Sequence, residues 1–140
     1  EIVRTHALNH SRSWLLSGSQ PPGVAAAQKA AIEVLMNEPE HHKKLWENTE
    51  YFRSEMQSMG FDTGVSTTPI IPVMCGESSV AKDLSRLLMQ DGVMAGAIVF
   101  PMVAKNKARV RTQMSAGISS EDLNEVLSVF KKHGSAIGLI

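Results

Sequence analysis

The chain has 140 residues, of which 43% are apolar and 20% are charged, and its 14 basic side chains balance its 14 acidic ones. This length suffices for one domain with its own core, and a net charge of zero argues against nucleic acid or an anionic membrane as the main partner. The single cysteine, Cys75, excludes an internal disulfide and favours a reducing compartment, and no apolar run is long enough to span a membrane. Because the chain begins at Glu1 rather than at Met, we expect a fragment or a processed product.

Near the start of the chain, Ser13–Ser17 predicts a short apolar strand. It leads into a turn of glycine, serine and proline at 18–23, whose backbone can approach an anion closely before the next helix begins. His6 and His10 are one helical turn apart, but no nearby carboxylate or cysteine completes a metal set. We therefore predict surface histidines and no metal site.

Two helices should follow. The first, at 24–36, is rich in alanine, and we expect it to be mostly buried against something larger than this chain provides. Pro39 suits the first turn of the second helix, at 40–59, and Gly60 suits its end. Residues 1–60 are therefore predicted to be a helical lead-in.

Residues 61–140 predict the order strand, helix, strand, strand, helix. The first strand, at 70–75, contains Pro72, which indicates an edge position or a bulge. The following helix should be capped by Ser78 or Ser79, and the second strand should cover 93–100. The last helix should begin with a capping box formed by Ser119 and Asp122 and should end at Gly134. This order predicts an α/β fold of the α+β kind, with helices on one face of a mostly antiparallel sheet.

The strand expected after the turn at 105–107 is the most informative stretch. From 108 to 116 its residues alternate, with apolar side chains and Thr112 on one face and Arg109, Arg111 and Gln113 on the other. Planar guanidinium groups two residues apart can clamp a carboxylate or phosphate with paired hydrogen bonds. The alternative is a solvated strand face whose arginines bind nothing.

The order of residues around this strand resembles the C-terminal domain of the α-oxoamine synthases. These are pyridoxal-phosphate acyltransferases of the aspartate-aminotransferase fold type I. The chain most resembles the glycine C-acetyltransferases, also called 2-amino-3-ketobutyrate CoA ligases, and the 8-amino-7-oxononanoate and 5-aminolevulinate synthases share this C-terminal pattern closely. The likeness covers essentially the whole chain. Besides the arginine strand, it rests on 45–61, 69–74 and 137–140.

The resemblance implies a homodimeric enzyme that condenses an amino acid, glycine in the first instance, with an acyl-CoA to give a 2-amino-3-oxo acid or an aminoketone. It implies that Arg111 binds the substrate carboxylate and that Arg109 supports it. It also implies that Ser17 and Ser19 contact the cofactor phosphate of the other subunit, although Gly18 departs from the usual polar residue there. The enzyme is expected in the cytoplasm, or in mitochondria for a eukaryotic source.

The cofactor lysine of such enzymes lies in a large domain upstream, and no lysine of this chain has the family's sequence context. We therefore expect no catalytic residue in the chain, and the chain alone to be inactive. Two alternatives remain open. The order of elements in 61–140 also occurs in ferredoxin-like domains that bind ligands or regulate by dimerising, and a purely structural dimerisation piece is the third interpretation.

Overall fold

The computed structural model describes all 140 residues, except for the side chain of Leu15. The chain divides into two compact units, Glu1–Glu38 and Pro39–Ile140. Among the described residues, no helix combines the length and the apolar character that crossing a membrane requires.

The first unit holds three helices: α1 (Ile2–His10), α2 (Arg12–Leu15) and α3 (Pro22–Asn37). The strand predicted at Ser13–Ser17 is wrong, because the amides of Trp14 and Leu16 donate to carbonyls three and four residues back; residues 13–15 belong to the short helix α2, which ends before Leu16. No residue of α1 or α3 is buried within the chain, and Ile32 and Met36 of α3 are 59% and 76% exposed. The expectation that α3 needs a larger neighbour thus stays a prediction.

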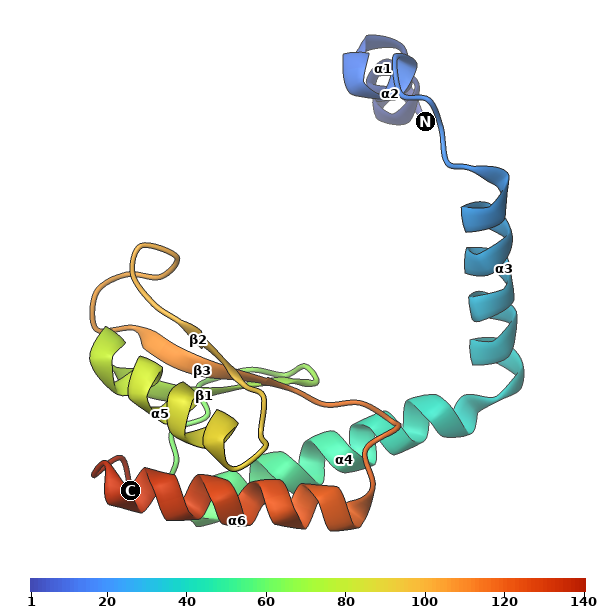
Figure 1. The fold of residues 1–140 in the computed structure, drawn as a ribbon. Coiled ribbons are helices and arrows are strands. Elements are labelled where there is room, and N and C mark those ends of the chain that lie inside the picture. Colours follow the sequence, from blue (N-terminus) through green and yellow to red (C-terminus); the bar gives the residue numbers. More distant parts are fainter. The chain divides into compact units, whose positions relative to one another are not determined.

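The second unit is a three-stranded sheet with helices packed on one face (Figure 1). The elements are α4 (Pro39–Ser58), β1 (Ile70–Gly76), α5 (Ser78–Gln90), β2 (Gly96–Ile98), β3 (Ala108–Gln113) and α6 (Ser120–Ala136). The predicted order of strands and helices is confirmed, and both strand pairings are antiparallel. The sequence placed the division after residue 60, but the compact unit begins at Pro39. Helix α4 belongs to this unit because its Phe52 and Met56 are fully buried in the core.

Strand β3 lies in the middle of the sheet, in the order β1-β3-β2. Pro72 is opposite Arg111 on the edge strand β1, which accommodates a residue without an N–H, and the register shifts between Met74 and Gly76. The predicted alternation is confirmed: Ala108, Val110 and Thr112 are buried, whereas Arg111 is exposed.

The core lies between the sheet and the helices. Phe130 of α6 is fully buried and makes edge-to-face contacts with Phe52 and Phe61, with ring centroids 6.1 Å apart in both pairs. Such pairs contribute beyond the area they bury. On the sheet side, Val73 and Val110 are fully buried opposite each other.

The ends of the elements confirm one expectation and correct others. The capping box is confirmed, because the Asp122 amide donates to Ser119 Oγ and the Ser119 amide donates to the Asp122 carboxylate. Helix α5 has Glu77 at its N-cap, instead of Ser78 or Ser79, and β2 covers only part of the predicted 93–100.

Gly134 does not end the last helix. The helix continues to Ala136, and an added Cβ at Gly134 would lie 2.7 Å from Phe61 Cε1. The glycine is therefore explained by the close approach of the Phe61 ring and does not mark a helix end.

Candidate functional site

The candidate site is the face of the sheet that the helices leave open. On this face, Arg111 lies between Pro72 of β1 and Gly96 of β2, and Arg109 lies between Met74 and Ile98. None of these cross-strand neighbours carries a charge. The two guanidinium groups therefore have no acidic partner on the neighbouring strands.

Arg111 is exposed, and among the side chains that the structure describes it has no hydrogen bond or ion pair. It lines a hollow of about 380 Å³. The other walls come from β1 and the loop before it, from β2 and the loop after it, and from β3 itself; these residues are Ser66, Thr68, Ile70, Pro72, Ile98, Val103 and Arg109. Gly96 adds no obstruction, because a Cβ built there would meet nothing within 4 Å. The arrangement leaves room for an anionic ligand beside the guanidinium.

Arg109 is half-buried and is held differently. Its Nε donates to the Lys107 carbonyl at 3.2 Å, which fixes the side chain and leaves the terminal nitrogens for other partners. It lines the first hollow and also a second one of about 660 Å³, together with Lys107, Asp62 and Met74. The structure thus brings both predicted arginines to one continuous surface.

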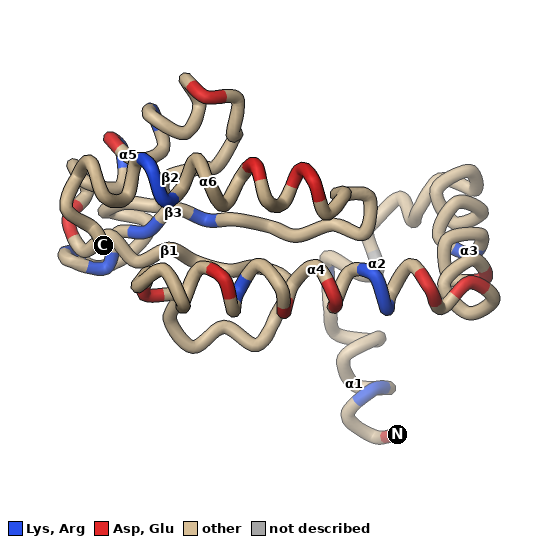
Figure 2. Tube along the Cα trace, turned by 90° about the horizontal axis from the view of Figure 1, so that it is seen from below, with Lys and Arg blue, Asp and Glu red and all other residues tan. Residues whose placement is uncertain are grey.

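Cations gather along this part of the chain. Lys105 and Lys107 precede β3, and the Lys and Arg positions near β2 and β3 can be followed in Figure 2. Lys105 Nζ lies over the Phe100 ring, 5.7 Å from its centroid. Asp62 is the acidic residue that lines the second hollow, and its Oδ1 accepts a hydrogen bond from the Gly64 amide at 2.8 Å. The open face is thus locally basic in a chain of zero net charge.

The predicted phosphate-binding serines lie in the first unit. Ser17 and Ser19 line one hollow with Trp14 and Gln20, and Ser17 Oγ donates to the Trp14 carbonyl at 3.1 Å. Both serines are exposed, and Ser19 has a left-handed backbone, with φ of 59°. Hydroxyl donors without an acidic residue in the lining suit a phosphate group.

The backbone of this segment contributes less to anion binding than the sequence suggested. Helix α3 begins at Pro22, which has no N–H, and the amides of Val24 and Ala25 both donate to the Pro21 carbonyl. Few N-terminal amides of this helix are therefore left for an anion. Ser17 already donates its hydroxyl proton to the Trp14 carbonyl, so the Ser19 hydroxyl is the main remaining donor.

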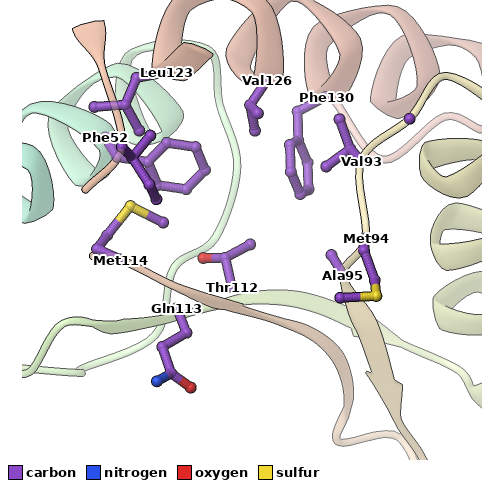
Figure 3. Close-up of a pocket in the computed structure, with 12 residues that line it drawn as sticks. Phe52, Val93, Met94, Ala95, Thr112, Gln113, Met114, Leu123, Val126 and Phe130 are labelled. Carbon is purple, nitrogen blue, oxygen red and sulfur yellow. The ribbon is translucent and has the colours of Figure 1, made fainter. Parts of the chain in front are cut away.

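A further pocket lies on the helix side of the sheet and is apolar (Figure 3). It has about 220 Å³ and is lined by residues that include Phe52, Met114, Val126 and Phe130. The hydroxyl of Thr112 in its wall already donates to the Ile71 carbonyl at 2.7 Å. None of its described lining residues is charged, so it offers packing surface and no groups for acid–base chemistry.

The perturbed titratable groups lie away from the arginine face. Lys132 and His133 of α6 both contact Asp91 Oδ2, at 2.6 and 2.8 Å, and hydrogen bonds from these two groups lower the pKa of the Asp91 carboxyl. Burial raises the pKa of the Cys75 thiol, which makes it a poor nucleophile. Asp91, Lys132 and His133 link α6 to the end of α5, and Cys75 is a buried residue of β1.

Lys107 and Asp62, which sequence reasoning did not assign to the site, line its second hollow. Lys107 belongs to the turn before β3, and Asp62 lies far away in sequence. A run of cations every second residue, at 105, 107, 109 and 111, was the available signal for Lys107. No sequence pattern pointed to Asp62, because its position depends on how the loop before β1 folds back.

Comparison with known proteins adds relatives and a family. The family described as aminotransferase class I and II matches residues 1–130. An 8-amino-7-oxononanoate synthase from Symbiobacterium thermophilum is 50% identical over 92% of this chain and 33% of its own length. An 8-amino-7-oxononanoate synthase/2-amino-3-ketobutyrate coenzyme A ligase from Thermus thermophilus is 43% identical over 95% of this chain and 34% of its own length. The chain thus spans about a third of the length of these curated relatives.

Solved structures show the same fold. A structure described as SPT with PLP has a TM-score of 0.90 at 24% identity and covers 100% of this chain and 36% of its own. Sphingomonas wittichii serine palmitoyltransferase has a TM-score of 0.87 at 24% identity, over 98% of this chain and 35% of its own. The predicted fold class is therefore confirmed. The predicted closeness to glycine C-acetyltransferases is not specifically supported. The Symbiobacterium relative is named only as an 8-amino-7-oxononanoate synthase, and the Thermus relative is named both for this activity and as a 2-amino-3-ketobutyrate coenzyme A ligase.

Proposed function

Because the chain belongs to the aminotransferase class I and II family, we propose that it is the C-terminal part of a pyridoxal-phosphate enzyme that joins an amino acid to an acyl thioester. The observation that carries this proposal is Arg111. It is exposed on the open face of the central strand, beside a hollow, and has no partner among the described side chains.

Arg111 has the properties that binding an amino-acid carboxylate requires. Its planar guanidinium can donate two parallel hydrogen bonds, which fix the orientation of the carboxylate as well as its position. Its strand is hydrogen-bonded on both sides, to β1 and to β2, so the base of the side chain is held firmly. Orientation matters in this reaction class, because the bond at the α-carbon that reacts has to be aligned with the cofactor ring.

Pyridoxal phosphate, when bound, would supply the electron sink for chemistry at the α-carbon. The resemblance places Ser17 and Ser19 at its phosphate, across a dimer interface. Ser19 can donate its hydroxyl there, whereas Ser17 would first have to release the Trp14 carbonyl. The lysines of this chain are exposed or half-exposed, and we assign the residue that holds the cofactor to the part of the enzyme that precedes this chain. The chain alone is then inactive and contributes substrate binding.

The relatives' names define the substrates that this enzyme can be expected to use. They indicate an acyl donor that yields either 8-amino-7-oxononanoate or 2-amino-3-ketobutyrate, so an acyl-CoA or a related thioester is the second substrate, and glycine remains one candidate amino acid. A location in the cytoplasm is in keeping with the single cysteine and the bacterial relatives, and the homodimer is what the resemblance implies.

The alternative of a ferredoxin-like regulatory module is less well supported. Such a module would close the arginine face with its own helices or with a second copy. In this chain, the helices cover the other face, and Arg111 stays exposed. A purely structural dimerisation piece gives no reason for unpaired arginines on one strand face.

The test is steady-state kinetics of the complete enzyme with both substrates varied. Charge-assisted hydrogen bonds contribute about 1.5–3 kcal/mol, so Arg111→Ala should raise the amino-acid KM about tenfold or more and change the acyl-thioester KM much less. Arg111→Lys should restore only part of the loss, because an ammonium group cannot reproduce the planar fork. An amino-acid KM within about twofold of the parent in Arg111→Ala would refute the proposed clamp.

A further inference from the structure

The loop that joins α4 to β1 forms one wall of the hollow beside Arg111 (Figure 1). This loop covers residues 59–69 and contains no helix or strand. Ser66 and Thr68 are the loop residues that line the hollow. The shape of this wall therefore depends on what holds a segment without regular secondary structure in place.

The hydroxyl groups in this wall are arranged by a local hydrogen-bond network. Ser66 Oγ donates to the Ile70 carbonyl at 2.6 Å and accepts from the Thr68 amide at 3.3 Å. The Ser66 and Thr68 hydroxyl oxygens lie 3.1 Å apart, and because Ser66 gives its proton to Ile70, the Thr68 hydroxyl is the donor between them. Both hydroxyl protons are thus committed inside the wall, which leaves a carboxylate in the hollow to the guanidinium of Arg111.

A side chain from the helical layer holds this network. Arg53 of α4 donates from Nη2 to the Thr68 carbonyl at 3.0 Å. Its Nη1 donates to Glu50 Oε1 at 2.7 Å, and its side chain is only 16% exposed. The planar guanidinium makes both bonds at once, so the ion pair on α4 fixes the direction in which Arg53 reaches Thr68.

The other attachments of the loop lie on either side of this bond. Thr63 Oγ1 accepts from Gln57 of α4 at 2.8 Å, and the Pro69 carbonyl accepts from the Met114 amide at 2.9 Å. Between these two points, Arg53 makes the only hydrogen bond that a described residue of the helices gives to the loop. Loss of the Arg53 side chain would therefore release the part of the loop that faces the hollow.

We propose that Arg53 is a positioning residue for amino-acid binding. It does not line the hollow itself, but it holds the wall of Ser66 and Thr68 beside Arg111. Without it, the wall can move, and its hydroxyl protons become free to compete with Arg111 for the substrate carboxylate. This inference rests on the proposed function and adds to it a residue from the covered side of the sheet.

The experiment compares Arg53→Met with Arg86→Met in the complete enzyme. Methionine keeps a long apolar side chain and removes the donors. Arg86 of α5 is the matched control, because it also pairs with an acidic residue three positions back, Asp83, and has no bond to a loop.

Arg53→Met should raise the amino-acid KM about fivefold and leave the acyl-thioester KM within about twofold of the parent, since only the orientation of the amino acid depends on the wall. Arg86→Met should change neither. Arg53→Lys should restore part of the loss, because its ammonium group can reach the Thr68 carbonyl but cannot bond to both partners as a planar fork.

A double-mutant cycle with Arg111 separates positioning from a general loss of stability. If the wall acts on the substrate that Arg111 binds, Arg53→Met should raise the amino-acid KM by less than about twofold in the Arg111→Ala background. A rise of the same size in both backgrounds would overturn the inference. An amino-acid KM in Arg53→Met within about twofold of the parent would overturn it as well.

Hydrogen exchange of the complete enzyme without substrates tests the contact independently of the proposed function. The amides of Thr68 and Ile70 both donate to hydroxyl oxygens of the network. Their exchange should be about tenfold faster in Arg53→Met and unchanged in Arg86→Met. Unchanged exchange in Arg53→Met would show that Arg53 does not hold the wall, whereas an unchanged amino-acid KM in Arg111→Ala would refute the proposed function alone.

Discussion

The two faces of strand β3 differ in whether the rest of the chain covers them. On the covered face, Val110 is fully buried against the core, and Thr112 is satisfied by the Ile71 carbonyl. On the open face, Arg111 is exposed and has no partner among the described side chains. The covered face is thus explained by contacts inside the chain, and the open face calls for a ligand or partner outside it. Changes on the covered side should alter the free energy of unfolding, and changes on the open side should alter binding.

The largest effect is expected for Phe130→Ala on the covered side. Phe130 is fully buried and contacts both Phe52 and Phe61, so its truncation should lower the free energy of unfolding by about 3–5 kcal/mol. Urea unfolding monitored by circular dichroism measures this. A loss below about 1 kcal/mol would show that the helical layer is not the core that the burial suggests.

Gly134→Ala should come next. The new Cβ would lie 2.7 Å from Phe61 Cε1, and Phe61 is itself buried, so the ring cannot easily move away. Overpacking of this kind typically costs about 1–3 kcal/mol, more than alanine gains in helix propensity. Thermal unfolding of Gly134→Ala, with the exposed Ser135→Ala as control, tests this; equal melting temperatures in the two variants would contradict the close-packing explanation.

Ser119→Ala should have a smaller effect, because it removes one partner of the capping box at the start of α6. Loss of such a cap lowers the free energy of unfolding by about 1 kcal/mol. Ser119→Asp, which can still accept from the Asp122 amide, should retain most of the stability. If the aspartate variant is as unstable as the alanine variant, the cap hydrogen bond is not the cause.

A pH-dependent effect of small size is expected at Asp91. Hydrogen bonds from Lys132 and His133 lower its pKa in the folded state, so its contribution to stability is complete above the unfolded pKa of about 3.9 and is lost as the pH falls through the lower folded value. Asp91→Asn should therefore be less stable than the parent at pH 6, and the difference should shrink below pH 4 or so. A difference that stays constant between pH 6 and pH 3 would contradict this linkage.

The smallest effect on stability is expected on the open face. Arg111→Ala removes an exposed side chain without a described partner, so the free energy of unfolding should stay within about 0.5 kcal/mol of the parent. Val110→Ala, the adjacent residue on the covered face, is the matched control and should be clearly destabilised. If Arg111→Ala destabilises as much as Val110→Ala, the functional contrast between the two faces does not hold.

Periodic patterns were the features that the sequence predicted best. Alternation identified the buried and exposed sides of β3, and Pro72 indicated an edge position or a bulge for β1, because both depend only on local geometry. The capping box of Ser119 and Asp122 is likewise a local signal. For these elements, spacing along the chain determines the structure.

Features set by distant contacts were predicted less well. Gly134 was predicted to end a helix, but its role depends on Phe61, which is far away in sequence. The strand predicted at Ser13–Ser17 failed for a different reason: local hydrogen bonds satisfy its backbone, and residues 13–15 belong to α2. In the candidate site, the arginines could be predicted from the sequence. Asp62 could not, because the fold of the loop before β1 brings it to the second hollow.

The central position of β3 has a consequence for how such a site can diversify. Since β3 pairs with both β1 and β2, a slip by one residue would bury both arginines and expose Val110, at a cost on two pairings at once. The loop at 99–106, before Lys107, can therefore lengthen, shorten or change composition without turning the arginines to the wrong face. Insertions in this loop can reshape the hollow beside Arg111 over generations, because Val103 of the loop lines it, while Arg109 and Arg111 keep their places on the strand.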